Sequence, residues 1–179
     1  MVRAIGIGAL ILSVFGCVWL MAGIFLLDLD KPDLLLIVIG SYSFLIAVVS
    51  IWQILGGGKG ESIVPDPDLS ERIFKITNIT LWTTIAAFIL ILNALNKADW
   101  LPWIVSTIVG VHFIPLARAF HLRSYIVVAA VILILNAVLP ILHTQFRNAY
   151  SCIGTGVVLL ITATYRLVWL WRHSEYPDE

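Results

Sequence analysis

Long apolar runs, separated by short polar breaks, fill almost the whole chain. Charged residues or Pro/Gly clusters bound each run, and within the runs polar residues do not alternate with a period of two. A helix needs about 20 apolar residues to cross a bilayer core of about 30 Å, and continuous apolar runs favour helices over a barrel. The pattern therefore predicts an all-α polytopic transmembrane helix bundle with six spans, near residues 4–27, 33–55, 73–96, 99–120, 123–143 and 149–171.

One connection between the predicted spans is long. Residues 56–72 are rich in Gly, Pro and Asp, and they lack the Gly-Lys-Ser/Thr sequence that ends a phosphate-binding loop. This composition predicts a flexible polar linker. The other connections are short, so we expect a single transmembrane domain over residues 1–179 in which successive helices are antiparallel.

The basic residues predict which way the helices cross the membrane. With six spans, both termini and the second and fourth connections share one side, which holds eight Lys and Arg residues against three on the other side. Loops that face the cytoplasm carry the excess of Lys and Arg. Both termini are therefore predicted to be cytoplasmic, in a multi-pass protein of the cell membrane.

Composition excludes a soluble domain. Hydrophobic residues make up 60% of the chain and charged residues 12%, whereas soluble domains carry about 25% charged residues. Zinc-binding Cys/His spacings and the common hydrolase signatures do not occur, and no Asp or Glu lies in the interior of a predicted span. We expect no enzymatic activity, no metal and no cofactor. The expected partners are the lipid bilayer and a second copy or another membrane protein, but no nucleic acid.

The densest group of candidate residues lies in the fourth span, around His112 and Pro115. Because Pro115 has no N–H, the carbonyl of Val111 loses its helical partner, and the helix is expected to bend. His112 lies beside this carbonyl, about 9 Å of helical rise from Arg118. At that depth a histidine is expected either to sense a proton or ligand at a polar cavity, or to hold the bend through a hydrogen bond to a neighbouring helix.

The fifth span contains a second proline, Pro140, which frees the carbonyl of Asn136. The segment 129–138 also repeats the segment 86–95 at a spacing of 43 residues, which pairs Asn136 with Asn93. The repeat indicates either a duplicated helical hairpin or chance similarity between apolar helices. The two asparagines are expected either to line a vestibule in the outer half of the membrane or to bond neighbouring helices.

Further polar residues are predicted at the depth of His112. Asn78, Thr80 and Tyr165 are candidates to line the same pocket, or to form hydrogen bonds between helices. Three arginines lie near the predicted cytoplasmic boundary: Arg118, Arg123 and Arg166. They are expected to extend to the interface and contact anionic lipid headgroups.

Residues 112–117, with the sequence His-Phe-Ile-Pro-Leu-Ala, resemble an H-F-x-P-L-A signature of small bacterial integral membrane proteins without an assigned activity. The resemblance covers this segment, the chain length and the multi-span layout. It implies a protein of the bacterial cytoplasmic membrane in which His112 and Pro115 are important. It implies no particular activity.

Two functions from different classes fit these residues. The first is binding or passage of a small solute through polar pockets between helices, with His112 as the gating or sensing residue. The second is a non-catalytic membrane subunit that packs against or stabilises a partner protein through its helix faces and the linker. At the level of the sequence both functions stay open.

Overall fold

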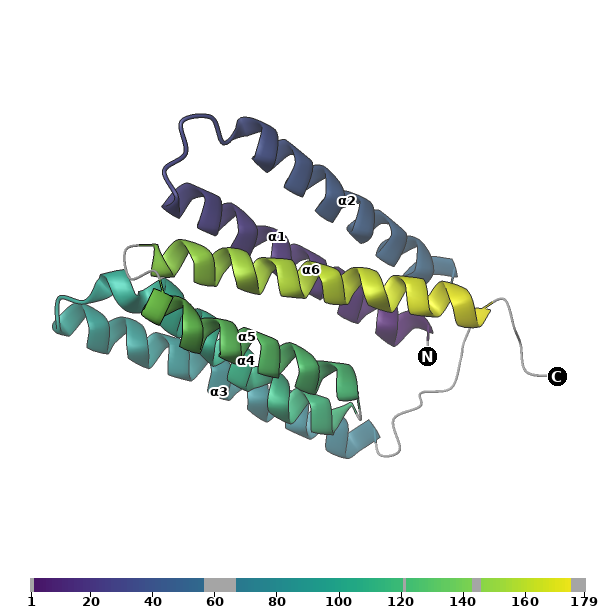
Figure 1. Cartoon of the computed structure of the whole chain (residues 1–179). Helices are drawn as coiled ribbons and strands as arrows, with labels where there is room; N and C mark the ends of the chain where they lie inside the picture. Colours follow the sequence, from purple (N-terminus) through teal and green to yellow (C-terminus); the bar gives the residue numbers. More distant parts are fainter. Residues whose placement is uncertain (1, 57–66, 121, 143–145, 175–179) are drawn as a thin grey trace.

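Figure 1 shows the computed structural model of the protein, which describes residues 2–56, 67–120, 122–142 and 146–174. Over these residues the chain is all-helical and has no β-strand, so the predicted fold class is confirmed for this part. The described helices follow one another as α1 (Val2–Leu26), α2 (Asp33–Gly56), α3 (Pro67–Ala94), the short 3-10 helix η1 (Ala98–Trp100), α4 (Leu101–Ala119), α5 (Arg123–Leu142) and α6 (Arg147–Ser174).

Several of these helices have the length and composition of membrane spans. Among the described residues, five stretches are long and apolar enough to cross a bilayer: Gly6–Leu26, Asp33–Gly56, Asp68–Ala94, Ala98–Ala119 and Arg147–Trp169. The corresponding apolar part of α5, Arg123–Leu139, is shorter. The chain therefore has the helices of a membrane protein, as the long apolar runs predicted.

The start of α3 differs most from the sequence-based expectation. The linker was predicted over residues 56–72, but α3 already begins at Pro67. Proline suits the first position of a helix because its missing N–H would have no helical partner there. Asp68 in the first turn places a negative charge at the positive end of the helix dipole. A polar turn therefore precedes the apolar part of this helix.

Helices α1 and α6 approach each other closely, and glycines lie at their contact. A Cβ atom on Gly156 of α6 would lie 2.8 Å from the carbonyl oxygen of Gly16 in α1. Further along the pair, a Cβ atom on Gly23 would lie 2.9 Å from the carbonyl oxygen of Ala149. Small residues allow helix backbones to approach closely in a membrane, where van der Waals packing holds helices together. The glycines of α1 thus serve a partner within the same chain.

Helix α6 lies in the middle of the bundle. It contacts α1, α2, α4 and α5, and in Figure 1 it runs, in yellow, between the α1–α2 pair and the other helices. Its Leu159 and the Ile132 of α5 are almost fully buried in the core. The start of α1 and the end of α6 lie together (Figure 1), and we call this the terminal end of the bundle. The end where α1 finishes and α6 begins is called the opposite end.

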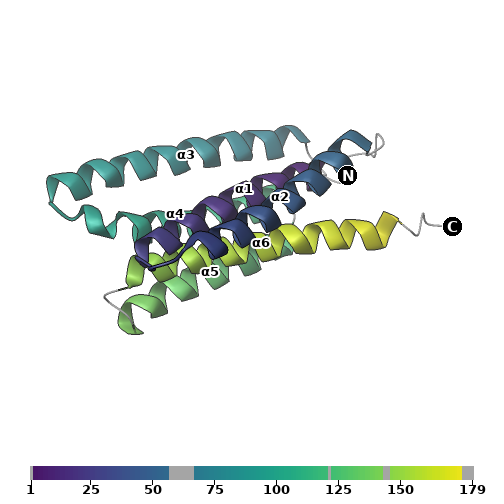
Figure 2. The same cartoon turned by 90° about the horizontal axis from the view of Figure 1, so that it is seen from above.

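Helix α3 lies at the edge of the bundle, as Figure 2 shows. Its main contacts are with α4 and η1. Ser70 Oγ donates a hydrogen bond of 2.7 Å to the carbonyl of Ala119, and the rings of Phe74 and Phe120 meet edge to face. Most of the large apolar side chains on α3 are exposed. In a bilayer these side chains would contact lipid.

Candidate functional site

Three buried polar side chains from three helices meet in the half of the bundle nearer the opposite end. Asn136 of α5 donates through Nδ2 to Ser106 Oγ of α4 at 2.8 Å. A second hydrogen bond joins the hydroxyls of Ser106 and Thr155 of α6. All three side chains are at most 2% exposed. We call these three residues the polar knot, which ties α4, α5 and α6 together inside the bundle.

The side chain of Trp103 is the hydrogen-bond partner of the backbone carbonyl that Pro140 leaves free. Pro140 lies four residues after Asn136, so the Asn136 carbonyl has no N–H within its own helix. The indole Nε1 of Trp103 in α4 donates to this carbonyl at 2.8 Å. The helix can therefore contain the proline without leaving a bare carbonyl in an apolar interior, where an unpaired polar group costs several kcal/mol.

Two buried oxygen atoms in and beside the polar knot have no hydrogen-bond partner among the described residues. These atoms are Asn136 Oδ1 and Ser151 Oγ. Ser151 lies four residues before Thr155 on α6, and residues at this spacing share one helix face. A buried acceptor without a partner costs about 1–3 kcal/mol. Both atoms are therefore able to accept a hydrogen bond from a water or from a bound polar molecule.

Arg147 is the buried cation at the opposite end of the bundle. Its guanidinium carbon lies 3.6 Å from the ring centroid of Trp100, and its Nη2 lies 3.8 Å from Asp99 Oδ2. The neighbouring Asn148 donates through Nδ2 to the carbonyl of Asp99. The start of α6 is thus tied to η1 by a ring contact, an ion pair and a hydrogen bond. Arg147 has both an aromatic face and a counterion.

Arg166 is the buried cation at the terminal end. Arg166 is 8% exposed, and its guanidinium carbon lies 4.6 Å from the ring centroid of Tyr125 in α5. The Tyr125 hydroxyl and the guanidinium lie on the same side of α1, beside the backbone of Gly8. A Cβ atom on Gly8 of α1 would overlap with Nη1 of Arg166, so the guanidinium occupies space that the missing side chain of Gly8 leaves open.

The two buried arginines differ in their counterions. Arg147 has Asp99 nearby, whereas among the described residues no carboxylate pairs with Arg166. The sequence predicted that Arg166 would extend to the lipid headgroups together with Arg118 and Arg123. Those two side chains are exposed, but Arg166 is held inside the bundle because Gly8 and Tyr125 provide space and a ring face for it.

The buried polar residues of α6 follow one line along the helix. The line has a spacing of three or four residues, which keeps its members on one face of an α-helix. It contains Arg147, Ser151, Thr155, Leu159, Thr162 and Arg166, all of them at most 9% exposed. We call the five polar members the polar face of α6. Its two arginines are about 28 Å apart along the helix axis, and Leu159 interrupts it between the two halves.

His112 lies away from the polar face of α6. It is partly buried and lies within hydrogen-bonding reach of the backbone of Thr77 in α3. Helix α4 continues through Pro115 and ends at Ala119. The neighbour that the structure gives to His112 is thus the backbone of the peripheral helix. The polar side chains expected near it, Asn78 and Thr80, are partly and fully exposed, respectively.

The other predicted site residues are not gathered in one place. Tyr165 is 59% exposed, and Asn93 is exposed and donates through Nδ2 to the carbonyl of Ile89 in its own helix. Of the predicted pore residues, Asn136 belongs to the polar knot. The structure therefore does not bring these residues together around His112, and it gives the central position to α6.

Several residues of the observed site carried no clear signal in the sequence. Ser106 is one hydroxyl in an apolar span, and Arg147 was expected to be a boundary charge. A repeat of polar residues every three or four positions in α6 was the available signal. This spacing indicates a buried polar face only if α6 is the central helix, because on a peripheral helix the same spacing indicates a solvent-exposed or lipid-exposed face.

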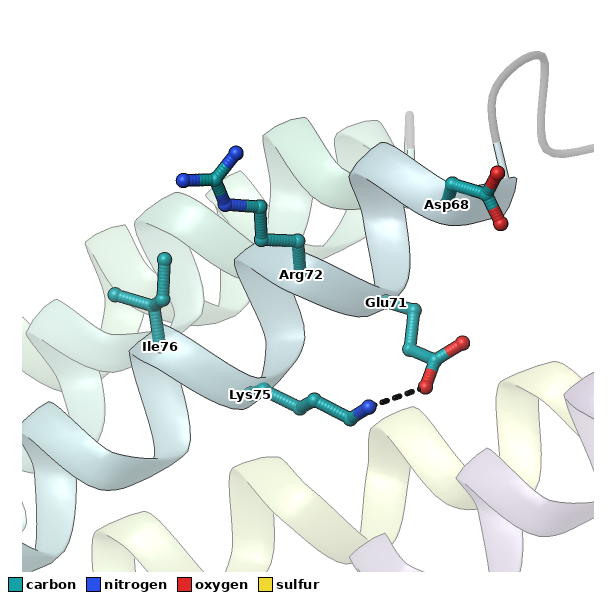
Figure 3. Close-up of a pocket in the computed structure, with 5 residues that line it drawn as sticks. All are labelled: Asp68, Glu71, Arg72, Lys75 and Ile76. Carbon is teal, nitrogen blue, oxygen red and sulfur yellow. Dashed lines mark ion pairs between the residues drawn. The ribbon is translucent and has the colours of Figure 1, made fainter.

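A shallow hollow at the start of α3 is lined by charged side chains. Figure 3 shows Glu71 and Lys75 on one side of the helix and Arg72 on the other, with Asp68 at the first turn and Ile76 beyond them. Lys75 Nζ lies 2.6 Å from Glu71 Oε1, and both side chains are more than 60% exposed. An exposed pair four residues apart on a helix is a weak interaction in water. The hollow is therefore part of the solvated start of α3.

Comparison of the chain with protein-family models, with curated proteins and with solved structures gave no match. The function is therefore inferred from the chemistry and positions of the buried polar groups. Among these groups, the polar face of α6 and the polar knot offer the largest set of hydrogen-bonding atoms inside the bundle.

Proposed function

We propose that the protein binds a small solute inside the membrane and passes it along the polar face of α6. The observation that supports this proposal is the line of buried polar side chains that runs along the central helix between Arg147 and Arg166. Ionisable residues are rare inside membrane helices, and they commonly mark the path of a substrate or an ion.

The polar knot is the binding point of this proposed path. It offers hydroxyl groups from Ser106 and Thr155 and an amide from Asn136, and the acceptor Oδ1 of this amide has no partner among the described residues. A solute with hydrogen-bond donors would satisfy that oxygen. The same groups are held in place by three helices, so the site would be preorganised.

A packed apolar layer closes the path in this structure. Ile132 and Leu159 are almost fully buried between the polar knot and Arg166. Passage therefore requires these side chains to move apart, as in hydrophobic constrictions that gate channels. The role of His112 in this proposal is to hold α3 against α4 through the backbone of Thr77.

Osmotic swelling of proteoliposomes tests the proposed function. The probes are glycerol, urea, potassium chloride and potassium phosphate, each imposed as a gradient. We expect swelling faster than that of protein-free vesicles for at least one probe, and slower swelling for Thr155→Val, which removes the hydroxyl and keeps the shape. Thr83→Val is the matched control, because Thr83 is exposed and bonds only its own helix at Ile79. Swelling equal to that of empty vesicles for every probe would rule the function out.

We further propose six membrane spans with both termini in the cytoplasm, in the cytoplasmic membrane of a bacterium. The excess of Lys and Arg at the terminal end supports this orientation. Asp30→Cys and Lys59→Cys, each in a background that lacks Cys17 and Cys152, would report it in intact cells. We expect an impermeant maleimide to label the cysteine at position 30 and to leave the one at position 59, in the predicted linker, unlabelled; the reverse result would invert the topology.

A further inference from the structure

We propose that Arg166 is the binding point for an oxyanion, a phosphate or carboxylate group, at the terminal end of the bundle. This inference deepens the proposed function, because it names the chemical class of the solute. The site consists of the Arg166 guanidinium, which occupies the space above Gly8, and the neighbouring Tyr125 hydroxyl.

The first argument is the missing counterion. Arg166 is 8% exposed, and burying a charged side chain is unfavourable unless a counterion or hydrogen bonds compensate for the lost water. Arg147 on the same helix face offsets such a cost with Asp99 and Trp100. Among the described residues Arg166 has the ring and hydroxyl of Tyr125 and no carboxylate. An anion bound from outside the chain would supply the missing charge.

The second argument is the number of donors. A guanidinium has five N–H groups in a planar fork that matches the two oxygens of a carboxylate or phosphate. The groups that the structure places beside this fork are the ring and hydroxyl of Tyr125 and the backbone of Gly8. A hydroxyl oxygen has two lone pairs, so Tyr125 alone leaves at least three of the five donors for an oxyanion.

The third argument is the room made by Gly8. A side chain at this position would overlap with Nη1 of Arg166 and would lie 3.7 Å from the Tyr125 hydroxyl oxygen. The glycine thus holds the guanidinium and the hydroxyl in one place on the surface of α1. An oxyanion bound to this guanidinium would contact Arg166 of α6 and Tyr125 of α5 beside the surface of α1.

Thermal unfolding in dodecyl maltoside micelles, which contain no phosphate, tests this site. The probes are inorganic phosphate and, separately, phosphatidylglycerol added to the micelles. We expect at least one of them to raise the Tm of the wild-type protein in a saturable manner. Arg166→Gln should weaken the apparent affinity at least about tenfold, the size expected for the loss of a charge-assisted hydrogen bond.

Two pairs of variants separate binding from folding. Gly8→Ala displaces the end of the flexible Arg166 side chain without changing any charge, so it should weaken the response, whereas Gly40→Ala should not, because its nearest neighbour would be Met21 Cε at 3.7 Å. Arg123→Gln removes an exposed arginine near Tyr125 and should keep most of the response. No response of the wild-type protein to either probe, or an equal response of Arg166→Gln, would overturn the inference.

The outcomes also distinguish this inference from the proposed function. A response to inorganic phosphate identifies a free oxyanion as the ligand, and a response to phosphatidylglycerol alone identifies a lipid headgroup. Both results support the oxyanion site, but binding without swelling of proteoliposomes would contradict solute passage. Swelling with glycerol or urea and no response to either anion would keep the proposed function and reject the oxyanion site.

Discussion

The ends of α3 and α5 share nearly the same local sequence and have very different surroundings. Residues 86–95 and 129–138 are identical at eight of ten positions. Asn93 and Asn136 each donate through Nδ2 to the carbonyl four residues earlier, at 2.8 and 2.9 Å. Asn93 is exposed, however, whereas Asn136 is 2% exposed and also bonds Ser106. The local sequence therefore determines the hydrogen bond within the helix. The neighbouring helices determine whether the asparagine is buried and which other side chain it bonds.

This difference follows from the position of α6. Helix α5 lies between α4 and α6, so its asparagine meets hydroxyl groups from both. Helix α3 packs mainly against α4, so its asparagine faces outward. An asparagine that is buried between helices can specify their arrangement, and an exposed one cannot. Moving α6, removing either amide or loosening α3 should therefore affect the two asparagines unequally.

The largest effect is expected from Gly156→Ala. The added Cβ would lie 2.8 Å from backbone atoms of Gly16 and Leu20 in α1, which cannot move as a side chain end can. The substitution should shift α6 and reduce the free energy of unfolding by about 1–3 kcal/mol, as overpacking does in well-packed cores. Because Thr155 is the preceding residue, the polar knot should loosen as well. Unfolding in a denaturing detergent measures the loss, and Gly40→Ala, which has room, should leave the free energy unchanged.

A smaller effect is expected from Asn136→Ala. The substitution removes the hydrogen bond to Ser106, and the membrane average for such bonds is about 0.6 kcal/mol with a maximum near 1.7. We expect a loss of about 1 kcal/mol in the free energy of unfolding. In a variant that keeps Trp103 as its single tryptophan, fluorescence emission would check whether the hydrogen bond of Trp103 to the carbonyl of residue 136 loosens at the same time. A free energy equal to that of the wild type would show that the polar knot does not stabilise the bundle.

Ser70→Ala should act on α3 alone. It removes the hydrogen bond to the carbonyl of Ala119, which joins the start of α3 to the end of α4. We expect a loss of about 0.6 kcal/mol or less in the free energy of unfolding. Hydrogen exchange should become faster in α3 alone. Thr83→Ala removes a hydroxyl that bonds only its own helix and serves as the control. Equal acceleration in α5 and α6 would contradict a peripheral α3.

The smallest effect is expected from Asn93→Ala, the counterpart of Asn136→Ala. Asn93 is exposed, and its hydrogen bond lies within α3. The free energy of unfolding should stay within the error of the measurement. A loss as large as that of Asn136→Ala would mean that Asn93 also contacts a helix, for example in a second copy of the chain.

The sequence predicts the helices much better than their partners. The apolar runs place the helices correctly because a membrane span is determined by the composition of its own residues. The membrane span was predicted to begin at residue 73, six residues after α3 begins at Pro67, since the polar first turn resembles the linker before it. The free carbonyl of Asn136 followed from Pro140, which lies in the same helix. Its partner Trp103 lies 33 residues away, and no local pattern specifies that distance.

The candidate site was predictable only in part for the same reason. Asn136 was predicted as a polar residue inside the membrane, but Arg166 was predicted at the cytoplasmic boundary, among lipid headgroups. Its burial depends on Gly8, a residue more than 150 positions earlier in the chain, and on Tyr125. Glycine and arginine that meet across two helices leave no periodic signal in either helix.

The central place of α6 has a consequence for how the chain is made. Among the described helices α6 comes last along the chain, and yet α1, α2, α4 and α5 all contact it. Gly16 and Gly23 of α1 are therefore synthesised well before the α6 residues that they face. We expect chains truncated before residue 147 to leave these two glycines without their packing partner.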